Sequence, residues 1–145
     1  MVRFRLGREE DSRAPVEGWP PPVDSEGIWA IPLGDRNYRI ENVPWFAQGT
    51  AFGDVVSAVE FEGNRWVMNG MAWSGHLTVR VACPDPSAVL GKFADLGVRG
   101  ESAAPFGIAA LDIPPDADLH AVVARLRAGG YDYEEACVTD EWRGL

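Results

Sequence analysis

Four side chains in the middle of the chain carry the groups that a hydrolase would use. Asp54, Ser74, His76 and Cys83 supply a carboxylate, a hydroxyl, an imidazole and a thiol. A nucleophile needs a base within hydrogen-bond reach and an oxyanion site beside it. Ser74 and His76 are two residues apart, so they would share a face of a regular strand. The segment 73–76 lacks a nucleophile elbow, so we favour a turn followed by a polar strand end over triad chemistry.

Arg80 is the most suggestive charged residue of the same segment. It lies between two valines and would project from the face that carries His76 and Thr78. A guanidinium in that position is exposed, paired or directed at an anion. We predict an ion pair with Asp54 or Glu41, and a carboxylate or phosphate ligand is the alternative.

The other titratable residues favour ordinary structural roles. His120 falls in the first turn of an expected helix, where we expect it to be exposed and inert. Asp132 and Glu134 would share a strand face, and a solvated strand end is favoured over acid–base or metal chemistry. Cys83 and Cys137 are expected to be reduced, small apolar side chains, with no histidine cluster to form a zinc site. Without a glycine-rich phosphate loop either, the sequence predicts no catalytic residue, no metal and no cofactor.

Aromatic residues supply the remaining candidate contacts. The chain has six tryptophans. Trp19 precedes three prolines and Trp142 lies in an acidic tail, so both are candidate partner-binding residues. Packing of the loop and the tail onto the sheet is an equal alternative. Trp45 and Phe46 follow a proline, and we expect at least one of them at a rim or cleft.

Length, composition and charge limit the function classes. The 145 residues, 46% of them hydrophobic, predict a single domain over 1–145 with two packed halves, 1–75 and 76–145. Without an apolar run of membrane-spanning length or a signal-peptide pattern, we expect a cytoplasmic location and no membrane partner. The net charge of −9 is concentrated in residues 9–26 and 131–145. This acidity disfavours nucleic-acid binding, which needs a basic face.

The first half reads as strands and hairpins. Alternation over 2–6 predicts a short strand, and the proline-rich stretch 7–27 predicts a long loop. Two hairpins are expected, over 28–43 and 54–73, with their turns at Gly34 and Gly63. The expected fold class is therefore α+β, with an antiparallel, barrel-like N-terminal half.

The second half alternates strands and helices. We expect strands over 76–83, 106–113 and 131–138. Asp85 is expected to cap the first helix, and Asp116 or Asp118 the second. Strand–helix–strand crossovers favour parallel neighbours, so a ferredoxin-like βαβαβ half is predicted.

The order of these segments resembles an uncharacterised bacterial family, domain of unknown function 4265. The matching pieces are the opening strand, the proline-rich loop leading to 26–30, and the stretches 38–46, 53–56, 74–80 and 111–114. The resemblance covers nearly the whole chain. It implies the extent of the domain and a bacterial origin, and no activity or cofactor.

Three functional hypotheses remain. The first is a non-catalytic module that binds a protein or peptide. The second is a small-molecule binder or small enzyme with a pocket between the halves. Its candidate ligand-binding residues are Tyr38, Trp45, Phe46, Asp54, His76 and Arg80. The third is an immunity or antitoxin protein whose acidic surface neutralises a basic toxin.

Overall fold

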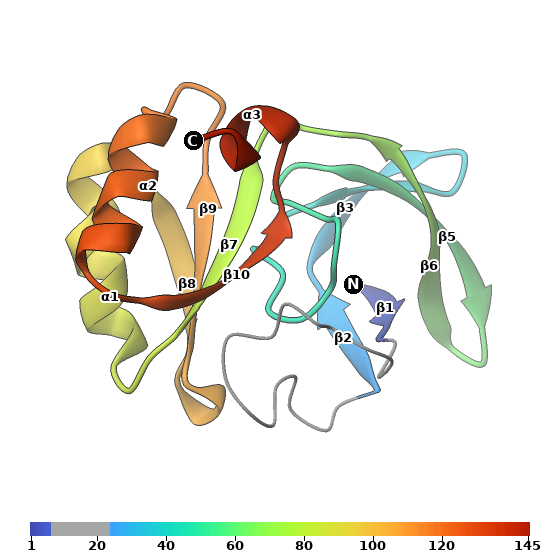
Figure 1. The fold of residues 1–145 in the computed structure, drawn as a ribbon. Coiled ribbons are helices and arrows are strands. Elements are labelled where there is room, and N and C mark those ends of the chain that lie inside the picture. Colours follow the sequence, from blue (N-terminus) through green and yellow to red (C-terminus); the bar gives the residue numbers. More distant parts are fainter. Residues whose placement is uncertain (7–23) are drawn as a thin grey trace.

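The computed structural model describes residues 1–6 and 24–145, and within them a mixed α+β fold with two sheets and few helices. Figure 1 shows the two sheets side by side, with the longer helices covering the outer face of one of them. The strand orders are β2-β1-β6-β5-β4-β3 in the first sheet and β10-β7-β9-β8 in the second. Trp19 lies outside the described residues, as do residues 7–23 of the expected loop.

The first sheet contains both predicted hairpins. Its strands are β1 (Val2–Arg5), β2 (Ser25–Ile28), β3 (Ala30–Gly34), β4 (Asn37–Ile40), β5 (Val55–Phe61) and β6 (Asn64–Ala72). The pairs β3–β4 and β5–β6 are antiparallel, and β1 pairs with β6 in parallel. Alternate side chains bury a small core on one face, formed by Val2, Ile28, Ile40, Val56 and Ala58.

The barrel-like expectation for this half is wrong, because the sheet is not closed. Its two outer strands, β2 and β3, are separated in sequence by Trp29 alone and do not pair with each other over the described residues. The backbone of Trp29 is used elsewhere: its N–H donates to Asn42 Oδ1 at 2.9 Å, and its carbonyl accepts from Glu41 N at 2.9 Å. The chain thus passes from one edge of a curled sheet to the other without completing a ladder.

The second sheet carries the helices. Its strands are β7 (Leu77–Ala82), β8 (Arg99–Ala103), β9 (Ile108–Ile113) and β10 (Asp132–Cys137). The helices are α1 (Pro86–Phe93), α2 (Leu119–Ala128) and α3 (Asp140–Arg143), with short 3-10 turns at Ala94–Leu96 and Ala104–Phe106. Asp85 and Asp118 cap α1 and α2 by accepting from Ala88 N and Ala121 N. The larger core lies between the helices and the apolar face of this sheet.

Two expectations for this half need correction. Strand β8 was not predicted, because its sequence Arg-Gly-Glu-Ser-Ala lacks an apolar run. Its presence between α1 and β9 makes every neighbouring pair in the sheet antiparallel instead of parallel.

The polar face of the second sheet is also covered. Thr78, Arg80, Asp112 and Glu134 project from it, and none is more than 8% exposed. The segment 41–54, which joins β4 to β5, runs between the two sheets and hydrogen-bonds to several of these residues. Of the predicted site residues, Arg80 therefore lies at the junction of the two sheets.

Candidate functional site

Arg80 is a fully buried cation in the junction. Its Nε donates to Glu134 Oε2 at 2.9 Å, and both side chains are 0% exposed. Its two terminal nitrogens donate to three carbonyls, those of Pro44 (3.2 Å), Phe46 (3.2 Å) and Ala47 (2.9 Å). A guanidinium has five donors in a fixed fork, which suits this set of acceptors. The guanidinium of Arg80 thus serves a structural role, because Nε and both terminal nitrogens donate to groups of the protein itself.

The predicted partners of Arg80 are wrong. Asp54 accepts instead from two backbone amides, Ala51 N at 2.9 Å and Ser74 N at 2.8 Å. Glu41 pairs with Arg39 at 2.9 Å on the surface. The solvated strand end expected at Glu134 is wrong too, because this carboxylate is buried directly opposite Arg80 in the β7–β10 ladder.

Glu26 holds the same segment from the other sheet. Its carboxylate accepts from the N–H groups of Trp45 (2.5 Å), Phe46 (2.9 Å) and Ala47 (2.9 Å). Glu26 belongs to β2 and Arg80 to β7, so the backbone of 44–47 is bound by an anion from one sheet and a cation from the other. We refer to Glu26, residues 44–47, Arg80 and Glu134 as the clamp. Sequence reasoning missed Glu26, because a lone glutamate after a loop carries no signal of burial.

Trp45 and Phe46 lie in this clamped segment and are half-buried. The Phe46 ring meets Phe106 edge-to-face, with centroids 5.2 Å apart. The indole N–H of Trp45 is buried and has no hydrogen-bond partner among the described residues. Neither ring lines the groove or the other hollows described below, so the expected position at a rim or cleft stays a prediction.

Ser74 and His76 do not form a nucleophile–base pair. The Ser74 hydroxyl donates to the Phe52 carbonyl at 2.6 Å and accepts from the backbone N–H of His76 at 3.2 Å. The His76 ring turns to Asp112, with Nδ1 2.6 Å from Oδ1. Burial raises the pKa of Asp112, and the His76 hydrogen bond opposes that rise. The preference for a turn and polar strand end over a triad is supported.

The remaining candidates are dispersed. Tyr38 lines a separate small hollow with Arg36 and Arg65. Trp142 is 3% exposed and packs in the larger core, so of its two expected roles the structure favours packing over partner contact. His120 is exposed, as expected. Tyr38, Asp54, His76 and Arg80 therefore do not converge on one pocket between the halves.

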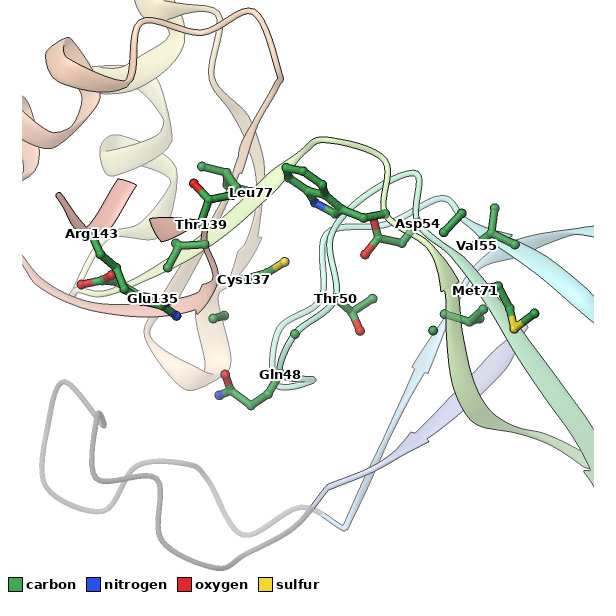
Figure 2. A pocket seen from close by; sticks show the side chains of 17 residues that line it. Gln48, Thr50, Asp54, Val55, Met71, Leu77, Glu135, Cys137, Thr139 and Arg143 are labelled. Atoms are coloured by element: carbon green, nitrogen blue, oxygen red, sulfur yellow. The ribbon is translucent and has the colours of Figure 1, made fainter. Parts of the chain in front are cut away.

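A groove of about 740 Å³ lies between the two sheets (Figure 2). One wall comes from β5 and β6, the other from β10, residues 138–139 and Arg143 at the end of α3, and residues 48–50 form its base. Labelled members in Figure 2 are Gln48, Thr50, Asp54, Val55, Met71, Leu77, Glu135, Cys137, Thr139 and Arg143. Met71 and the neighbouring Trp73 are each 56% exposed at the rim. Burial raises the pKa of the Cys137 thiol in this wall to about 11, so this thiol is protonated and weakly nucleophilic.

Residues 26–135 match the model of a protein family, Domain of unknown function (DUF4265). The chain belongs to the DUF4265 family. The matched stretch begins at Glu26 and includes Arg80 and Glu134, so both ends of the clamp lie within the DUF4265 domain.

One solved structure has a similar fold. It is described as a novel crystal structure of a hypothetical protein from Neisseria gonorrhoeae. It shares 17% sequence identity and a TM-score of 0.68, with 94% of each chain covered. At this identity the likeness concerns the fold alone.

No curated protein matches the DUF4265 chain. None of the helices in the described part is long and apolar enough to cross a membrane.

Proposed function

We propose that the chain is a non-catalytic binding module whose groove holds an extended peptide segment of a partner protein. The observation that carries this proposal is the groove itself, open between the two sheets and edged by exposed Met71 and Trp73. Large exposed apolar side chains beside a concavity are typical of interaction sites. Methionine adapts its shape to varied partners, and tryptophan supplies a rigid contact surface.

The edge of β6 supports an extended peptide in particular. Strand β1 faces β6 only near Trp66, so residues 68–72 have no strand on their second edge among the described residues. A free strand edge presents N–H and C=O groups that an added strand can bind. A peptide in the groove would combine this backbone pairing with apolar contacts to Met71 and Trp73.

Charge supports a partner segment that is apolar and basic. Glu135 lines the groove, and Arg143, the only basic residue that the described part of the chain contributes to the lining, is bound to Asp140 at 3.2 Å. The whole chain carries a net charge of −9. Opposite charge on a partner accelerates encounter and selects orientation more than it adds affinity. An immunity or antitoxin role against a basic toxin would be a special case of the same binding.

A selection from a random peptide library on the full chain tests this function. Enriched peptides are then measured by fluorescence anisotropy against two groove variants, Trp73→Ser and Met71→Glu. We expect each variant to lose about tenfold or more in affinity, the size of a hot-spot loss. The matched control is Phe61→Ser, which removes an equally exposed ring (58%) outside the groove and should leave affinity unchanged. Failure to enrich any peptide, or equal binding by all variants, would refute the groove as the site.

We also infer that the second half is a ferredoxin-like unit. The support is its order β7-α1-β8-β9-α2-β10 with the sheet order β10-β7-β9-β8, in which each strand–helix–strand unit has one strand inserted between its two strands. This fold hosts many unrelated functions, so it does not alter the proposal.

A further inference from the structure

A second cavity, of about 540 Å³, lies at the β8 side of the second sheet. Among the described residues, none lines both this cavity and the groove. Its walls are formed by Val43 and Phe52 from the connection, His76, the strands β8 and β9, and the turns at 96–97 and 114–117. A concave site with a few polar groups among apolar ones is the usual form of a small-ligand pocket.

His76 has an unused ring nitrogen in this cavity. Its Nδ1 is bound to Asp112 Oδ1 at 2.6 Å, and Asp112 is 8% exposed. When Nδ1 carries the proton and donates it to the carboxylate, Nε2 is left as an acceptor. No described residue hydrogen-bonds to Nε2, and the side chain is 22% exposed. The Phe52 ring, with its centroid 5.5 Å from that of His76, forms the adjoining aromatic wall.

The polar groups of the cavity are mostly acceptors. Among the described residues, Glu101, Asp112 and Asp116 contribute carboxylates and Arg99 contributes the one guanidinium. Glu101 accepts from Asn42 Nδ2 at 2.9 Å, which fixes its position. A ligand that fits these groups presents N–H or O–H donors and a positive charge, and the faces of aromatic rings also attract cations.

We propose that this cavity binds a small organic cation that carries a hydrogen-bond donor, and that Nε2 of His76 accepts that donor. Asp112 acts through His76 as a positioning residue, because its hydrogen bond selects the ring orientation and tautomer. The site is independent of the peptide groove, so either can exist without the other.

A matched series of three probes tests the proposal by NMR on the full chain. Ethanolamine, ethylene glycol and glycolate each carry a hydroxyl on a two-carbon skeleton, and their net charges are positive, zero and negative. The imidazole Cε1–H signals of His76 and His120 are followed, and the exposed His120 serves as the internal control because the chain has only two histidines. We expect a saturable shift at His76 alone, with ethanolamine binding tightest and glycolate weakest.

Two variants within the cavity and one control variant outside it separate the site from non-specific effects. Arg99→Ala removes an exposed positive charge at the rim, so it should tighten ethanolamine binding, whereas Arg65→Ala, which lies outside the cavity, should not change it. Asp112→Asn should weaken ethanolamine binding, because it removes a carboxylate from the cavity and the acceptor that orients the His76 ring. The proposal would be overturned if His76 showed no saturable shift, if both histidines shifted equally, or if glycolate gave the largest shift. No effect of Arg99→Ala would also count against it.

Discussion

Arg80 is a buried guanidinium that satisfies one carboxylate and three backbone carbonyls. Replacing it by methionine fills part of the space and leaves those acceptors without their donor. Breaking a buried pair by removing one partner costs about 3–5 kcal/mol. We therefore expect Arg80→Met to lower the free energy of unfolding by about that amount, measured by urea denaturation.

The matched control is Arg39→Met, which breaks the exposed pair with Glu41. Exposed pairs contribute about 1 kcal/mol or less, so this variant should unfold close to the wild-type midpoint. Equal losses in the two variants would show that the burial of Arg80 adds nothing to its contribution.

Cys137 offers a second test at this scale. Burial raises the pKa of its thiol from 9.0 to about 11, and the thiolate is the reactive form. At pH 8 the thiolate fraction is thus about 100-fold lower than for a thiol with the unshifted pKa. In a Cys83→Ser background, which leaves Cys137 as the only thiol, we expect Ellman's reagent to react about 100-fold more slowly with the folded chain than in urea. Similar rates in both states would contradict the shift.

Side-chain direction was predictable from the sequence, whereas side-chain partners were not. The two-residue spacing correctly placed Thr78 and Arg80 on one strand face. The partner of Arg80 depends on the register of β10, which lies 54 residues further along the chain. No local pattern carries that register, so Glu134 resembled a solvated acid.

Helix α1 approaches β8 closely because residue 100 is a glycine. A Cβ there would lie 2.3 Å from the Ala110 carbonyl oxygen and 2.6 Å from Leu90 Cδ2, the latter on α1. Gly100→Ala must therefore displace the strand pair or the helix, and we expect it to cost about 2–3 kcal/mol, as overpacking does. Gly70→Ala in β6 is the control, because its Cβ meets nothing within 4 Å. Thermal unfolding of both variants checks this, and an equal effect would refute the close approach as the cause.

The elements that the sequence predicted are those with a strong local pattern. Both hairpins have glycine turns, and α1 and α2 have aspartate caps with apolar residues at helical spacing. Strand β8 has no apolar run because Arg99 and Glu101 line the polar cavity, and it has no alternation because the position that faces α1 is Gly100. Missing that one strand changed the expected pairing of the sheet from antiparallel to parallel. A pocket between the halves was among the hypotheses, but of its expected lining residues only Asp54 borders the groove. The rest of the lining was not predictable, since residues 48–50, 70–73 and 135–139 meet only through the tertiary fold.

At the scale of the whole molecule, buried polar side chains join the two sheets. Besides the clamp, Thr78 donates to the Thr50 carbonyl at 3.0 Å, and Gly49 N donates to the Ala136 carbonyl at 2.8 Å. The main role of residues 38–56 is therefore to connect the two sheets, since both sheets hydrogen-bond to this stretch. We refer to it as the joint. Because the groove lies directly over this joint, its shape depends on the joint staying intact.

Glu26→Gln tests this dependence. An amide has one acceptor oxygen, and its NH₂ group would face backbone N–H donors, so at least one of the three N–H groups of 45–47 loses its partner. Hydrogen bonds to a charged group contribute about 1.5–3 kcal/mol each, so we expect the free energy of unfolding to fall by at least about 2 kcal/mol.

If the joint makes the chain a single cooperative unit, tryptophan fluorescence and far-UV circular dichroism should give coincident urea transitions in the wild type. In Glu26→Gln the common transition should move to lower urea, and amide exchange should quicken at 45–50 before the strands of either sheet. Two separate transitions in the wild type would show that the halves fold independently, and an unchanged midpoint in the variant would show that Glu26 does not hold them together.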